Sequence, residues 1–188
     1  MAKAKPNEKS RAKAKEPVAS QKGFYHYIKQ AWKKPDKKTL RERMIQWRSS
    51  PVFTKVEKPL RLDRARSLGY KAKKGFVVVR VRVMRGGHKR SRPNKGRTGK
   101  RLHTRKNLQM NYQWIAEQRA AKKFTNLQVL NSYKIGKDGI YYFYEVIMLD
   151  PERPEIRNDR NFSWIAKREN RSRVFHGMTS AGKKSRGL

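Results

Sequence analysis

The first apolar stripes of the chain predict two consecutive amphipathic helices. The stripe of the first helix has helical spacing and consists of Phe24, Tyr25, Ile28, Ala31 and Trp32. Pro35 and Asp36 end this helix. The stripe of the second helix consists of Leu40, Met44 and Trp47. Thr39 and Glu42 stand three residues apart and predict a capping box there. Stripes of this kind usually pack, so we expect most of these aromatic side chains in the core or docked on the rest of the protein.

The strongest strand signal is the run from Phe76 to Met84. Its odd positions are all valine, at Val77, Val79, Val81 and Val83. Its even positions change along the run from apolar side chains to Arg80 and Arg82. Because alternate side chains of a strand point to opposite faces, one face is expected to pack inward along its whole length. The other face is expected to become cationic and to turn Arg80 and Arg82 towards solvent or a binding partner.

Further elements complete a predicted α+β fold. They are a strand at 52–56, a helix at 64–68, a helix at 108–123 and strands at 127–135 and 140–149. Asp63 is the predicted N-cap of the short helix and Gly69 follows its last residue. Residues 136–139 form a hairpin turn, and Pro154 begins another short helix. The last strand is apolar on both faces and is expected to lie centrally. The order strand–helix–strand–helix–strand–strand indicates a small, largely antiparallel sheet with packed helices.

The composition requires a densely anionic partner. The 188 residues include 50 Lys or Arg and only 14 Asp or Glu, which gives a formal net charge of +36. So much charge on a small body repels itself unless a polyanion neutralises it. The sequence has no apolar run long enough to span a bilayer, no secretory signal in its first residues and no cysteine. These features disfavour a membrane partner and favour nucleic acid.

The charge divides the chain into a body and basic appendages. Residues 1–22 carry seven basic and two acidic side chains and are predicted to be a disordered tail. Residues 23–159 form a single α+β domain, from which residues 85–106 extend as a loop with ten basic and no acidic side chains. An arm that follows phosphates explains this loop better than a solvated linker does. Residues 138–159 are acidic, and residues 160–188 form a basic C-terminal extension that we expect to be extended.

The sequence indicates no catalytic site and no metal site. The four histidines lie in different segments, at His26, His88, His103 and His176. The densest carboxylates are Asp150, Glu152, Glu155 and Asp159, the kind of groups with which a nuclease holds Mg²⁺. They come from one local segment, however, and pairing with the protein's own arginines is the simpler explanation. We therefore expect a binding protein that is not an enzyme, with no cofactor and with Mg²⁺ only as part of an RNA environment.

Four blocks of the sequence resemble the large-subunit ribosomal protein L-fifteen-e family of archaea and eukaryotes. They are FYHYIKQAWKKP at 24–35, RLDRARSLGYKAKKGFVVVRVRVMRGG at 61–87, VLNSYKIGKDG with YYFYEVIMLDP between 129 and 151, and GMTSAGKKSRGL at 177–188. The second and fourth blocks are specific. Residues 1–22 have no counterpart in the resemblance, and Leu62 and Ser67 stand where a more polar or basic residue is expected. The end of the chain at Leu188 favours an archaeal type.

The resemblance implies a structural constituent of the large ribosomal subunit, located in the cytoplasm within the ribosome. It implies large-subunit rRNA and neighbouring ribosomal proteins as partners, with no membrane and no small-molecule substrate. The residues that we expect to contact rRNA phosphates are Arg61, Arg64, Arg66, Lys71, Lys73, Lys74, Arg80, Arg82, Arg85, Lys89, Arg90, Arg92, Lys95, Arg97, Lys100, Arg101, Arg105, Lys106, Arg171, Arg173, Lys183, Lys184 and Arg186.

Two other classes of function stay open at the level of the residues. The first is a chromatin-like protein or RNA chaperone outside the ribosome, which would bind DNA and unstructured RNA about equally well. The second is a Mg²⁺-dependent nuclease that uses the carboxylates between residues 150 and 159.

Overall fold

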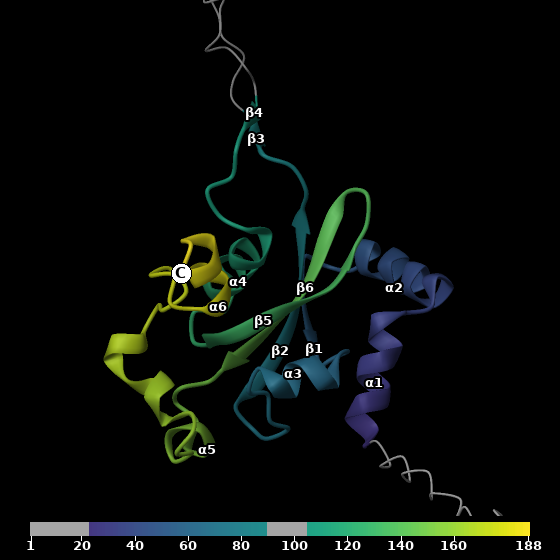
Figure 1. Ribbon diagram of the computed structural model, residues 1–188. Helices are drawn as coiled ribbons and strands as arrows, with labels where there is room; N and C mark the ends of the chain where they lie inside the picture. The colour runs from purple at the N-terminus through teal and green to yellow at the C-terminus, as the bar shows by residue number, and fades with distance from the viewer. Residues whose placement is uncertain (1–22, 90–104) are drawn as a thin grey trace, which may run out of the picture.

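The computed structural model describes residues 23–89 and 105–188, and it contains one antiparallel sheet with helices on both faces (Figure 1). The helices are α1 (Phe24–Lys33), α2 (Lys37–Ser49), α3 (Leu62–Ser67), α4 (Tyr112–Lys123), α5 (Pro154–Arg157) and α6 (Ser180–Ser185). The strands of the sheet are β1 (Phe53–Val56), β2 (Phe76–Met84), β5 (Gln128–Lys137) and β6 (Tyr141–Leu149). A short pair, β3 (His88–Lys89) and β4 (Arg105–Lys106), begins the basic loop, and two 3₁₀ turns span Ser163–Ala166 and Arg168–Asn170. The α+β class and the small antiparallel sheet are confirmed.

Strand β6 lies inside the sheet, as its apolar sequence predicts. The order of the strands is β1-β2-β6-β5, and every neighbouring pair is antiparallel. β2 and β6 pair along their whole length, from Phe76 opposite Leu149 to Met84 opposite Tyr141. The β5–β6 hairpin turns at residues 138–140, slightly later than the predicted 136–139 segment, because Gly136 and Lys137 still pair within the sheet. In the turn, Asp138 accepts a hydrogen bond from the amide of Ile140 at 2.8 Å. All but the first two residues of β6 are buried.

Both faces of the sheet are covered. On one face the odd-numbered valines of β2 pack with Ala116 and Ala120 of α4, and α6 packs on α4. On the other face Trp47 of α2 and Ala65 of α3 pack with Phe143 and other side chains of β5 and β6. Figure 1 shows α4 and α6 on one side of the strands and α2 on the opposite side. The body is therefore a three-layer sandwich of helices, sheet and helices.

The starts of three helices differ from the prediction, and in α2 and α4 the reason is that another side chain caps the helix. Asp36 caps α2 by accepting from the amides of Lys38 at 3.2 Å and Thr39 at 3.0 Å, so the Thr39–Glu42 capping box is wrong. Helix α3 begins at Leu62, and Asp63 lies inside it instead of capping it. Gly69 does follow this helix, with a φ of 99° that favours glycine.

Helix α4 is shorter at its start than the predicted helix from 108 to 123. Its N-cap is Asn111, which accepts from the amide of Trp114 at 2.7 Å. Helix α5 begins with Pro154, as predicted.

Helix α1 docks on α3, which is one of the two predicted outcomes for its aromatic stripe, and the stripe is not part of the core. Helix α1 is described over its whole length and buries none of its residues. In the stripe, Phe24 is 66% exposed and Tyr25 is 40% exposed. This helix packs along α3 and not on the sheet, so only Ile28 and Trp32 of its stripe are partly covered. In α2, by contrast, Trp47 is buried as expected.

The C-terminal segment folds back on the body, so the prediction of an extended segment is wrong for residues 160–188. Phe162, Ile165 and Val174 are buried, and the indole of Trp114 donates to the carbonyl of Val174 at 2.7 Å. These apolar residues have no regular spacing, so no helical or strand pattern signals them. The segment is held instead by contacts with elements that are distant in the sequence.

A buried carboxylate joins this segment to the body. Glu117 of α4 accepts hydrogen bonds from the hydroxyls of Ser132 in β5 and Thr179 before α6, the latter at 2.6 Å. All three side chains are buried. Burial raises the pKa of Glu117, although its two hydroxyl partners and the charge of Arg173 oppose this shift. Burial also raises the pKa of Glu145 in β6.

We predict that the free energy of unfolding of the protein increases as the pH is lowered towards the ordinary pKa range of a glutamate. The folded state binds protons on Glu117 and Glu145 at a higher pH than the unfolded chain does, so protonation favours folding. The stability gained is complete below the unfolded pKa and is lost as the pH rises through the folded pKa. Urea unfolding at several pH values measures this dependence of the free energy of unfolding on pH. Glu117→Gln should reduce this dependence, whereas Glu152→Gln, at an exposed position, should leave it unchanged. Equal slopes for the wild type and Glu117→Gln would contradict the prediction.

Candidate nucleic-acid interface

The predicted contact residues do not form one patch. Those that the structure describes outside β2 lie in three regions, which we call the α3 region (61–74), the hairpin base (85–89 with 105–106) and the C-terminal region (171–186). The α3 region precedes β2 and the hairpin base follows it. Because β2 has nine residues, its two ends lie about 30 Å apart. Figure 1 shows α3 and the β3–β4 pair towards opposite ends of the molecule. The predicted contacts outside the described residues are Arg90, Arg92, Lys95, Arg97, Lys100 and Arg101.

The loop of the α3 region is fixed by the acidic segment. Lys73 donates to Asp159 at 2.5 Å and to the carbonyl of Glu155 at 2.7 Å, and Lys71 pairs with Asp159 at 3.2 Å. The hydrogen bond from Lys73 holds the pKa of Asp159 well below its usual range. Carboxylates of this segment therefore pair with the protein's own cations, here with lysines as well as with Arg153. Within 23–89 and 105–188 no three His, Asp or Glu side chains are grouped closely enough to hold a metal ion.

Arg80 and Arg82 lie under α2 and do not face open solvent, so the expected orientation of this face is wrong. The Arg80 guanidinium lies 5.3 Å from the centre of the Trp47 ring and is half-buried. It stands opposite Glu145 in the register, and burial lowers the pKa of Arg80. Arg82 lies 4.8 Å from the centre of the Tyr141 ring and donates to the carbonyl of Arg48. Strand alternation places both arginines on one face correctly but does not reveal the helix that covers it.

Arg173 and Arg61 also make contacts inside the protein. Arg173 donates to the carbonyls of Val129 and Leu130, each at 2.9 Å, and burial lowers the pKa of its guanidinium. It thereby satisfies backbone oxygens of β5 and holds the C-terminal segment against the sheet. Arg61 donates to Asp63 at 3.3 Å, and its guanidinium lies 5.1 Å from the centre of the Trp32 ring. These contacts favour structural roles for both residues.

The hairpin base is rigidly anchored. Arg85 donates to the carbonyls of Asp138 at 2.8 Å and Gly139 at 3.2 Å, and it lies over the ring of Tyr142. The Tyr112 hydroxyl accepts from the amide of Gly86 at 2.9 Å. The two chain segments that lead into the basic loop then pair as β3 and β4. The two ends of the basic loop are therefore anchored on the body.

Other predicted contacts have exposed side chains on ordered backbone. They are Arg64, Arg66, Lys71, Lys74, Arg85, Arg171, Lys183, Lys184 and Arg186. A guanidinium matches a phosphate with two parallel hydrogen bonds, whereas an ammonium acts as a mobile point charge. This subset can reach a polyanion without any rearrangement of the fold.

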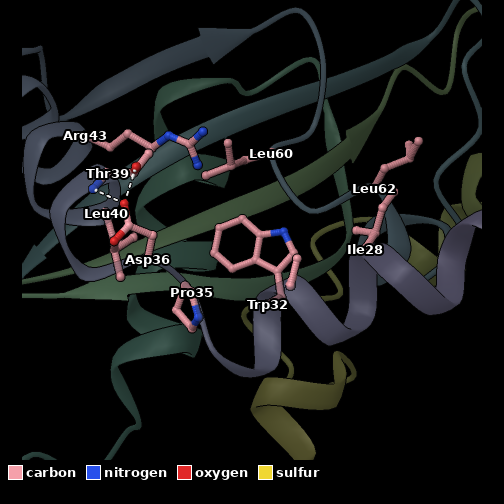
Figure 2. A pocket seen from close by; sticks show the side chains of 10 residues that line it. Ile28, Trp32, Pro35, Asp36, Thr39, Leu40, Arg43, Leu60 and Leu62 are labelled. Carbon is pink, nitrogen blue, oxygen red and sulfur yellow. Dashed lines mark hydrogen bonds between the residues drawn. The ribbon is translucent and has the colours of Figure 1, made fainter.

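Two hollows lie beside α1, and the sequence pattern did not predict them. The first has about 400 Å³ and is mainly apolar, and Figure 2 shows Ile28, Trp32, Leu60 and Leu62 around it, with the Asp36–Thr39 hydrogen bonds at its edge. The second has about 640 Å³, and four of its seven lining residues are cations; its lining includes Tyr25 and Lys29 of α1. The pair Tyr25–Lys29 has i,i+4 spacing, which places both side chains on one side of the helix. This spacing is the sequence signal for the second hollow, but an aromatic stripe at helical spacing favours packing and so conceals it.

The chain matches the model of a known protein family. The model of the family described as Ribosomal L15 matches residues 23–188, which is nearly the whole chain and includes every described residue. The match covers all four blocks on which the resemblance rests. No described helix combines the length and the apolar character needed to cross a membrane.

We predict that Arg80→Ala lowers the free energy of unfolding by about 1–3 kcal/mol. The substitution removes the cation beside the buried Glu145 and the contact with Trp47. Lys74→Ala is the matched control, because this side chain is exposed, and its effect should stay within about 0.5 kcal/mol. Chemical denaturation of both variants measures the difference. Equal stability of the two variants would show that Arg80 has no structural role.

Proposed function

This chain belongs to the Ribosomal L15 family, and from this premise we propose that it binds folded large-subunit rRNA through contacts between its exposed cations and phosphates. As a member of the family, the protein is a structural constituent of the large ribosomal subunit and takes part in translation. The family is one of non-catalytic ribosomal proteins. The archaeal type stays a prediction.

The observation that carries the proposal is the separation of the charges. The carboxylates at Glu117, Glu145 and Asp159 are engaged inside the protein, whereas cations such as Arg64 and Lys184 remain exposed on ordered elements. These cations lie in regions at both ends of β2 and along the C-terminal segment. A single straight duplex would meet one such region, but a folded RNA can surround the body.

The proposal divides the predicted contacts into two groups. Those with exposed side chains bind phosphate, and they include Arg64, Lys74 and Lys183. Arg80 and Arg173 support the fold from inside. Phosphate contacts of this kind position the protein without reading base sequence. The protein then acts as a non-catalytic component within the ribosome, beside neighbouring ribosomal proteins, with no cofactor of its own.

We predict a steep salt dependence of binding between the full chain and a large-subunit rRNA fragment. Each neutralised phosphate releases counterion and contributes roughly 0.7–0.9 to the slope of log K against log salt concentration. The double variant Lys183→Ala/Lys184→Ala should reduce the slope by up to about 1.8, because both side chains are exposed on α6. Lys123→Ala, at an exposed position of α4 outside the proposed contacts, is the control and should leave the slope unchanged.

Competition identifies the polyanion. Duplex DNA of equal length should displace the folded rRNA fragment poorly at moderate salt. Equal displacement by DNA would favour a general nucleic-acid binder. Failure of the full chain to bind the rRNA fragment at low salt would refute the proposal.

A further inference from the structure

We propose that the cationic hollow between α1 and α3 binds a single unstacked nucleotide of RNA, with its base on Tyr25 and Arg66 and its phosphate on Lys29 and Arg64. The inference rests on the proposed function and adds a specific mode of recognition to it. We call this hollow the α1–α3 cavity. Its lining is Tyr25, Lys29, Arg61, Asp63, Arg64, Arg66 and Ser67.

The size of the α1–α3 cavity suits one nucleotide. Its volume of about 640 Å³ lies within the range of roughly 300–1,000 Å³ that is typical of small-ligand sites. A paired duplex cannot enter a hollow of this size, because its bases are stacked inside the helix. A nucleotide that bulges out of a helix or lies in a loop presents its base and its phosphate separately.

Tyr25 and Arg66 form the stacking surface. The Arg66 guanidinium carbon lies 5.3 Å from the centre of the Tyr25 ring, and Arg66 also donates a hydrogen bond to the Tyr25 hydroxyl. Tyr25 remains 40% exposed although it is a large aromatic residue. Unpaired bases stack on aromatic rings and on guanidinium planes. The contact with Arg66 fixes the ring in place before a base arrives, so less freedom is lost on binding.

Lys29 and Arg64 supply the phosphate site. Both side chains are exposed, and both line the cavity beside Tyr25. The single carboxylate of the lining, Asp63, is already paired with Arg61 at 3.3 Å. The remaining cations therefore give the cavity a positive charge, which favours an anionic ligand.

The ligand chemistry follows from the combination of ring and cations. An acidic peptide would use the cations but would leave the Tyr25 ring unused. The neighbouring hollow of Figure 2 is a useful contrast, because Ile28, Leu60 and Leu62 make it mainly apolar. Helix α1 thus separates two hollows of different chemistry, and of these two it is the α1–α3 cavity that combines a partly exposed aromatic ring with several cations. A base with its own phosphate is the ligand that uses both.

The test compares two RNA hairpins of the same sequence, one fully paired and one with a single bulged adenosine, each bound to the full chain. Stacking persists in high salt whereas phosphate contacts weaken, so the comparison is made at elevated salt. The wild-type protein should bind the bulged hairpin about fivefold or more tightly than the paired one. Tyr25→Ala should abolish this preference, and Tyr25→Trp should keep it.

Tyr27→Ala is the matched control. Tyr27 lies on the same helix and is 59% exposed, but it does not line the α1–α3 cavity. This variant should keep the wild-type preference, and circular dichroism of all variants shows that the fold is retained. Equal binding of the two hairpins by the wild type, or a preference that survives Tyr25→Ala, would overturn the inference and leave phosphate binding intact. Loss of binding to both hairpins by the wild type would instead refute the proposed function.

Discussion

The constraint on which the structure depends is its excess of positive charge, with a formal net charge of +36 over 188 residues. Carboxylates are scarce, and the aspartates together with the buried Glu117 and Glu145 are engaged within the protein. Every aspartate lies in the described part of the chain and accepts a hydrogen bond or an ion pair from the protein itself. These residues are Asp36, Asp63, Asp138, Asp150 and Asp159. The cations that remain at the surface are therefore left without internal neutralisation, and an external polyanion has to supply it.

Two buried glutamates organise the layers of the fold. Glu117 lies on the α4 side of the sheet with Arg173 near it, and Glu145 lies on the α2 side opposite Arg80. Each carboxylate also accepts a hydrogen bond from a hydroxyl of β5, that of Ser132 for Glu117 and that of Tyr133 for Glu145. A buried charge is tolerated only where it is paired and hydrogen-bonded. The two networks therefore fix how the helices and the C-terminal segment sit on the sheet.

The sequence predicts the strands and the hairpin of this protein well, because alternation and turn residues are local signals. The bounds of β2 and the central place of β6 were both predicted correctly. The helix caps were harder to predict from the sequence, since neighbouring polar residues such as Asp36 and Thr39 compete for the same amides. The covering of Arg80 and the folding of the C-terminal segment depend on contacts between distant residues, which no local pattern records. The exposure of Tyr25 has the same cause, because its helix packs on α3 and not on the sheet.

The division of the cations into internal and external groups is tested most directly by a density map of the large ribosomal subunit with this chain in place. The account predicts phosphate oxygens within about 4 Å of the charged groups of Arg64, Lys183 and Lys184. It predicts none at Arg80 and Arg173, whose guanidinium groups stay on Trp47 and on the carbonyls of β5. Phosphates on Arg80 and Arg173, with Arg64 and the α6 lysines facing solvent, would contradict it.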